Sequence, residues 1–216
     1  MTGIRSVLFD LDGTLIDSER LILASYRHAM QTHLGHVPPE ETWLATIGQP
    51  LVVQMKMYAR TKEEVPALIR TYVEHNMAHH DDLVRPFPDM RDVVKTVRDA
   101  GFQLAIVTSK KAHAAGRGLR RCDLPEDWFE SRVTADDVER YKPEPDPVWR
   151  ALEELDVEAA EAVFVGDSTH DMVSGRAAGV STAAALWGPY SREQLEPTAP
   201  DTWLERPADI LELLGL

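Results

Sequence analysis

The spacing of apolar positions changes along the chain, and each change marks a predicted element. Residues 7–9 form a short apolar run of the kind found in buried strands. From about residue 19 to residue 80 the apolar positions recur at helical spacing, with stops at Gly35 and Gly48 and no convincing strand between them. After residue 89, short apolar runs alternate with helical segments as far as residue 186. Alternation of this kind predicts a parallel sheet with helices on both faces.

The pattern therefore predicts the α/β class, with a Rossmann-like, doubly wound parallel sheet and a helical bundle inserted after the first strand. Ser18 is expected to cap the first helix of the bundle. At the other end of the chain, a Trp-containing segment and an amphipathic helix in residues 201–216 are expected to cover the edge of the sheet. The remaining expected helices lie at residues 40–47, 50–59, 62–80, 89–100, 145–155 and 170–178, and a further helix follows residue 110 and ends at about residue 121. The remaining expected strands lie at residues 102–107, 132–134, 162–165 and 181–186.

Charge and cysteine content narrow the class of partner. The formal net charge of −13 argues against nucleic acid and against anionic membranes as binding partners. The single cysteine, Cys122, excludes an internal disulfide and favours the cytoplasm, and no Cys-His arrangement suggests a catalytic thiol. The first residues run directly into a strand, so we expect no signal peptide, and no apolar run approaches the ~18 residues of a membrane span.

Polar side chains recur where the predicted strands end. Asp10 and Asp12 follow the first strand, and Thr108 follows the strand expected at residues 102–107. Asp167 follows a later strand, and Asp171 lies four residues beyond it. In open α/β sheets the carboxyl ends of the strands line the ligand crevice, so these groups are expected to meet there.

Each of these residues also has a structural explanation. Asp10 and Asp12 could belong to a strand that ends in an Asp-Gly turn, and Thr108 could cap a helix. Asp167 could cap the helix that follows it, with Asp171 in its first turn. Lys142, which precedes a proline-rich helix start, could simply be solvated.

Together these residue types suit phosphoryl chemistry on a metal. Carboxylate oxygens are the ligands that Mg²⁺ prefers, and a hydroxyl and an ammonium group suit the oxygens of a phosphate. A carboxylate can attack phosphorus to form an aspartyl-phosphate, and a second carboxyl can move the proton.

Four segments, in order, resemble the motifs of the haloacid dehalogenase superfamily of phosphohydrolases. The first is DLDGTLIDS at residues 10–18, and the second is VTSK at residues 107–110. The third is KPEP at residues 142–145, and the fourth is GDSTHDM at residues 166–172. The resemblance spans about residues 6–186.

The resemblance implies a role for each matching residue. Asp10 would be the nucleophile and Asp12 the general acid and base. Thr108 and Lys142 would act in catalysis by holding the phosphoryl group, with Ser109 as a further substrate contact. The Mg²⁺ ligands would be Asp10, Asp12, Asp167 and Asp171, the last behind or beside the ion. The core would comprise residues 1–16 and 86–216, and residues 17–85 would form a small α-helical cap domain that closes over the site.

Within the superfamily, Asp12 favours phosphatases, because members that dehalogenate haloacids lack the second aspartate. The cap segment IGQP at residues 47–50 and ALWG at residues 185–188 resemble the phosphoglycolate phosphatase-like branch, whereas Ser109 stands where that branch usually has Asn. Gly48 and Gln49 are candidate contacts for the leaving group, with a helix stop before Pro50 as the alternative.

We therefore expect a Mg²⁺-dependent phosphatase that hydrolyses a small, phosphoglycolate-like metabolite through an aspartyl-phosphate. The alternatives are an inorganic pyrophosphatase, a sugar-phosphate phosphatase, a β-phosphoglucomutase-like phosphomutase, and a non-catalytic binding protein that kept the fold. The expected partner is a small phosphorylated substrate, and the expected assembly is a monomer or homodimer.

Overall fold

A six-stranded parallel sheet forms the centre of the molecule, in a computed structural model that describes residues 3–44 and 46–216. The strand order is β5-β4-β1-β6-β7-β8, and every neighbouring pair is parallel. The strands are β1 (Ser6–Phe9), β4 (Gln103–Val107), β5 (Ser131–Val133), β6 (Ala162–Gly166), β7 (Ser181–Ala185) and β8 (Thr202–Leu204). The predicted α/β class and doubly wound sheet are confirmed.

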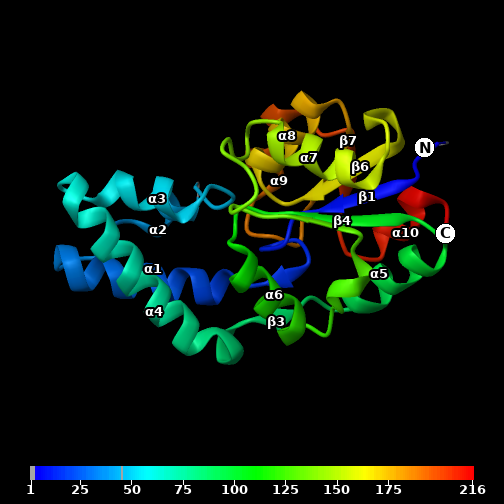
Figure 1. Cartoon of the computed structure of the whole chain (residues 1–216). Helices are drawn as coiled ribbons and strands as arrows, with labels where there is room; N and C mark the ends of the chain where they lie inside the picture. Colours follow the sequence, from blue (N-terminus) through cyan, green and yellow to red (C-terminus); the bar gives the residue numbers. More distant parts are fainter. Residues whose placement is uncertain (1–2, 45) are drawn as a thin grey trace.

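Helices cover both faces of this sheet (Figure 1). Alternate residues of β1 point to opposite faces, as the two-residue period of a strand requires. Val7 and Phe9 pack with α5 (Met90–Asp99), α6 (Ala112–Arg121) and α10 (Asp209–Leu214), whereas Leu8 packs with α7 (Asp146–Leu155). Helix α8 (Thr169–Ala178) lies beside α7, and α9 (Arg192–Leu195) follows β7. Because both faces are covered, β1 is fully buried, which explains its unbroken apolar run.

Residues 17–85, which we call the cap segment, contain the helices α1 (Glu19–Leu34), α2 (Glu40–Leu44), α3 (Leu51–Tyr58) and α4 (Val65–Leu83). These helices extend to one side of the sheet, with α1 running along α4 (Figure 1). Aromatic side chains hold them together, since the rings of Tyr26 and Trp43 stack with centroids 4.4 Å apart and Trp43 is fully buried. That the cap segment is a separate domain stays a prediction.

A short antiparallel ribbon pairs the two stretches of chain that connect the cap segment to the core. Strand β2 (Ile16–Asp17) pairs with β3 (Arg85–Pro86), so the chain leaves and re-enters the core at one place. The sequence pattern did not predict this ribbon, because two residues are too few to show a strand period and Pro86 is typical of a break. A proline is tolerated here because the ribbon has only two strands, both of which are edges.

Three local expectations were wrong in detail. Residues 202–204 do not cover the sheet edge but form the edge strand β8 itself, and α10 packs near α5. The fourth cap helix continues to Leu83, beyond the expected end at residue 80. Ser18 precedes α1 but makes no capping hydrogen bond, because its hydroxyl donates to Asp12.

Among the residues that the structure describes, no helix combines the length and apolar character that a membrane crossing needs.

Candidate active site

Strand register brings the first and fourth motifs together at one edge of the sheet. Phe9 lies opposite Ile106 on one side and Val165 on the other, and the backbone NH of Asp10 donates to the Val165 carbonyl at 2.9 Å. The residues that follow the three strands therefore emerge side by side. Asp10 is 4% exposed and Asp167 is fully buried.

Lys142 connects two of the carboxylates. Its Nζ donates to Asp10 Oδ1 at 2.8 Å, to Asp171 Oδ1 at 2.6 Å and to the Val107 carbonyl at 3.1 Å. An ammonium group has three N–H donors, so all of them are used within the protein. The solvated-lysine interpretation is wrong, because the Lys142 side chain is 1% exposed. In this structure Lys142 is the counter-ion of Asp10. To contact a phosphoryl group, Lys142 Nζ would have to exchange one of its three present hydrogen-bond partners for a phosphate oxygen.

Asp171 is fixed from the other side by the start of α8. Ser168 Oγ accepts from the Asp171 NH at 3.2 Å, while Asp171 Oδ2 accepts from the Ser168 NH at 3.0 Å and from its hydroxyl at 2.6 Å. This is a capping box in which the acidic partner also binds a lysine. Ser168, and not Asp167, is thus the N-cap of α8. Asp167 is left free for another role.

Asp167 lies in a narrow space between two glycines. Thr14 Oγ1 donates to Asp167 Oδ1 at 2.7 Å, whereas Asp167 Oδ2 is buried with no hydrogen-bond partner among the described residues. A Cβ on Gly13, whose φ is +85°, would lie 2.5 Å from that oxygen, and one on Gly188 would lie 2.4 Å from Asp167 Cβ. Both positions need glycine for the carboxylate to fit. An unpaired buried carboxylate oxygen is costly, so it points to a missing ligand.

Three buried carboxylates face one buried ammonium group. Oxygens of Asp10, Asp167 and Asp171 lie within 4.8 Å of one another, and Lys142 is the cation that touches two of them. Burial raises the pKa of Asp10 to about 7 and that of Asp167 well above its ordinary value, with the charge of Asp171 adding to both and Lys142 opposing. Burial lowers the pKa of Lys142, but the carboxylates of Asp10 and Asp171 outweigh it and raise the net value. Ionised together, the four groups carry two excess negative charges, which a divalent cation would balance.

Asp12 occupies the mouth of the site, apart from this cluster. Its Oδ1 accepts from the Ser18 hydroxyl and forms an ion pair with Lys110 Nζ, and its side chain is 16% exposed. Its Oδ2 has no hydrogen bond recorded within the described part of the chain. The sequence did not indicate Lys110 and Ser18 as partners of Asp12, although both lie inside the second and first motifs. A metal-ligand role for Asp12 stays a prediction.

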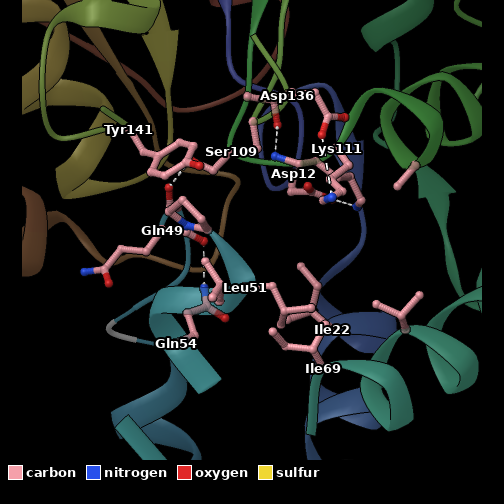
Figure 2. Close-up of a pocket in the computed structure, with 18 of the residues that line it drawn as sticks. Asp12, Ile22, Gln49, Leu51, Gln54, Ile69, Ser109, Lys111, Asp136 and Tyr141 are labelled. Carbon is pink, nitrogen blue, oxygen red and sulfur yellow. Dashed lines mark hydrogen bonds and ion pairs between the residues drawn. The ribbon is translucent and has the colours of Figure 1, made fainter. Parts of the chain in front are cut away.

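The second motif and the cap segment meet across a cleft. Thr108 is 4% exposed at the end of β4, and its Oγ1 accepts from the Lys110 NH at 3.2 Å, so it does not act as a helix cap. Ser109 Oγ donates to the Gly48 carbonyl, and the Tyr190 hydroxyl donates to the Ile47 carbonyl at 3.1 Å. These contacts place the candidate cap residues against the core (Figure 2).

Gly48 and Gln49 differ in what they offer to a substrate. The φ of Gly48 is +99°, and a Cβ there would lie 2.8 Å from Ser168 Oγ, so the loop approaches α8 closely. Gln49 Nε2 donates to His170 Nε2 at 2.8 Å. Figure 2 shows the Gln49 side chain turned away from the space between cap and core. The Gln49 amide therefore joins the cap to α8, and substrate contacts by Ser109, Gly48 and Gln49 stay predictions.

A cleft of about 920 Å³ opens between the cap segment and these core residues. Asp10, Asp12 and Thr108 line its core side. Side chains of α1, α3 and α4 line its cap side, among them Ile22, Leu51 and Ile69, which Figure 2 labels. The arrangement brings a buried, charged group of side chains to one end of a space large enough for a small organic molecule. Such a site can bind a divalent cation and present a carboxylate to a ligand.

Comparisons with known proteins agree on the family. Residues 7–185 match the family described as haloacid dehalogenase-like hydrolase. The chain is 39% identical to the pyrophosphatase PpaX of Anoxybacillus flavithermus over 99% of this chain and 98% of that protein. It is also 39% identical to the PpaX pyrophosphatase of Bacillus cereus, over 98% of this chain and 97% of that one.

A solved structure with the same fold is described as a predicted phosphoglycolate phosphatase from Haemophilus somnus. Its TM-score is 0.89 at 23% identity, with 99% of each chain covered. The matched region includes all four motifs and the strands that position them. The chain therefore belongs to the haloacid dehalogenase-like hydrolase family.

Proposed function

We propose that this chain is a Mg²⁺-dependent phosphatase that cleaves a small phosphorylated metabolite through an aspartyl-phosphate on Asp10. The observation that carries the proposal is the buried group of Asp10, Lys142, Asp167 and Asp171, which has an excess of negative charge and reaches the cleft through Asp10. A structural core would not keep such a group, because buried charges of one sign are costly unless a ligand compensates them.

The residues present fit a magnesium ion. Mg²⁺ prefers carboxylate oxygens, and Asp167 Oδ2 is a buried oxygen that lacks a partner among the described residues. Asp10, Asp167 and Asp171 would hold the ion, with Asp12 as a further candidate. When bound, the ion would neutralise the carboxylates and the phosphate oxygens that meet there.

The chain's own residues supply the remaining steps. Asp10 would form a bond to phosphorus while the ester bond breaks, and Lys142 would keep Asp10 ionised and in place. Asp12 would protonate the leaving oxygen through Oδ2 and later take a proton from the water that hydrolyses the acyl phosphate. Thr108 would donate to the transferred phosphoryl group from the end of β4.

Two substrate classes deserve direct comparison. The resemblance of the motifs to phosphoglycolate phosphatases supports a phosphoglycolate-like monoester. The name of the relatives in Anoxybacillus flavithermus and Bacillus cereus supports pyrophosphate as the second candidate.

We also propose the cytoplasm as the compartment, because Cys122 has no second cysteine in the chain with which to form a disulfide.

Phosphate release tests the proposal. The wild-type chain is assayed with phosphoglycolate, pyrophosphate, hexose phosphates and an aryl phosphate, with Mg²⁺ and with EDTA. Release should depend on Mg²⁺ and fall by about 10³-fold or more in Asp10→Asn, because that change removes the nucleophile.

Asp127→Asn is the matched control, since Asp127 is an exposed aspartate outside the cleft. It should retain wild-type activity. Activity that survives in Asp10→Asn would overturn the assignment of the nucleophile. A phosphoryl group that moves to a second hydroxyl of a hexose phosphate without free phosphate would identify a phosphomutase instead.

A further inference from the structure

The two sides of the active-site cleft differ in chemistry. Acidic and basic side chains line its core side, whereas the cap residues that line it carry no charge within the described part of the chain. The cap side is formed largely by Ile22, Leu51, Val52, Ile69 and Val73. Val52 is 37% exposed and Val73 is 42% exposed, although both are aliphatic. Figure 2 shows Ile22 and Ile69 on the cap side, across the cleft from Asp12.

The side-chain amide nitrogens on the cap side are already bound within the protein. Gln54 Nε2 donates to the Thr46 carbonyl at 2.8 Å and to the Gln49 carbonyl at 3.0 Å. Gln49 binds His170, and Asn76 Nδ2 donates to Ser25 Oγ at 3.4 Å. The surface that remains for a ligand on the cap side is therefore mainly carbon, together with the hydroxyl of Tyr72.

The ammonium groups on the core side are also paired. Lys110 forms an ion pair with Asp12, and Lys111 Nζ lies 3.6 Å from Asp136 Oδ1. Glu139 adds a further negative charge to the lining. A substrate with a second anionic group would thus displace the largely buried Lys110–Asp12 pair, draw on the exposed Lys111, or face the apolar cap surface.

We propose that the substrate is an organic phosphomonoester whose alcohol is uncharged and carries an apolar or aromatic body. The phosphoryl group would lie at Asp10, and the body would extend against Ile22, Ile69 and Val73. This inference rests on the proposed phosphatase function, but it opposes the two substrate classes named there, because the leaving groups of pyrophosphate and phosphoglycolate are anionic. A cleft of about 920 Å³ is ample for such a body.

A homologous substrate series measures the effect of the apolar body. The value of kcat/KM is determined with Mg²⁺ for ethyl, butyl and hexyl phosphate, and for phosphoglycolate and pyrophosphate. We expect kcat/KM to rise about fourfold per methylene group while the chain covers the cap surface, and to be lower for both anionic leaving groups. Equal values along the alkyl series, or a higher value for pyrophosphate than for hexyl phosphate, would overturn the proposal.

A charge placed on the cap side gives a second, independent readout. Val73→Lys should fold, because Val73 is partly exposed, and should shift the ratio of hexyl phosphate to pyrophosphate activity by about tenfold or more toward pyrophosphate. Met57→Lys is the control, because Met57 is 59% exposed and lies outside the cleft lining. Inhibition by inorganic phosphate should stay unchanged in Met57→Lys. An unchanged ratio of hexyl phosphate to pyrophosphate activity in Val73→Lys would contradict the proposal.

The two proposals fail in different ways. If no substrate releases phosphate, or if Asp10→Asn stays active, the phosphatase mechanism fails. If wild-type activity depends on Asp10 but shows no preference for apolar bodies, the inference about the leaving group alone fails.

Discussion

At the scale of single residues, Lys142 is the group on which the candidate site depends most. It is buried, and its three donors reach two carboxylates and one carbonyl. Removing one partner of a buried ion pair leaves charge without compensation, which costs more than the pair itself contributes. The free energy of folding should therefore be sensitive to this position in a way that surface lysines are not.

Lys142→Met should lower the free energy of unfolding by about 3–5 kcal/mol, measured by urea denaturation at pH 7 in EDTA. Lys111→Met is the matched control, because Lys111 is 79% exposed in its pair with Asp136, and surface pairs contribute about 0–1 kcal/mol. Equal losses in the two variants would show that Lys142 does not compensate buried charge.

The same variant has an expected pH dependence. Burial raises the pKa of Asp10 from 3.8 to about 7, so the folded state binds more protons than the unfolded state between these values. Stability in EDTA should accordingly fall as pH rises from about 4 through 7. Removing Lys142 removes the group that lowers this pKa, so the deficit of Lys142→Met relative to wild type should be larger at pH 8 than at pH 5.

Cys122 provides a test of burial away from the site. It is 2% exposed, and burial raises the pKa of its thiol to about 12. At pH 8 the thiol should stay protonated, so iodoacetamide should modify the native protein far more slowly than the urea-unfolded chain, where the pKa is about 8.5. Mass spectrometry measures both rates, and rapid modification of the native protein would contradict the burial of Cys122.

At the scale of elements, the start of α8 links helix capping to the active site. The capping box of Ser168 and Asp171 stabilises the helix, and Asp171 holds Lys142 with its other oxygen. Helix α9 has a second capping box, formed by Ser191 and Gln194, on the exposed surface. The two serines thus have the same local role but different surroundings.

Ser168→Ala should reduce stability by about 1 kcal/mol and also reduce kcat, because Asp171 loses the contacts that orient it. Ser191→Ala should reduce stability by a similar or smaller amount and leave kcat unchanged. Urea denaturation and steady-state kinetics separate the two effects. A loss of stability without a loss of kcat in Ser168→Ala would show that the capping box has no part in positioning Lys142.

At the scale of the whole molecule, the sequence predicted the sheet and the family. It did not predict the shortest strands or the side-chain contacts between motifs. The unbroken apolar run before Asp10, and the alternation of short apolar runs with helical segments after residue 89, are visible in the sequence and therefore predicted the sheet. The two strands of the β2–β3 ribbon are too short to show a period. The ion pair of Lys110 with Asp12 joins residues 98 positions apart, and only the folded chain brings them together.

The candidate site also has features that the sequence predicted and features that it did not. Residue types at strand ends pointed to Asp10, Asp12, Thr108 and Asp167, because parallel strands expose their carboxyl ends at one edge. The sequence could not predict that Gln49 turns toward His170, or that the cap side of the cleft is apolar. Both features depend on the way the cap segment lies on the core.

In the proposed mechanism, Asp10 carries the phosphoryl group during turnover. Rapid quenching of the enzyme during hydrolysis of a radiolabelled aryl phosphate with Mg²⁺, followed by peptide mapping, tests it directly. We expect a hydroxylamine-sensitive label on the peptide that contains Asp10, and none in Asp10→Asn. Label on a different side chain, or turnover of Asp10→Asn at the wild-type rate, would contradict it.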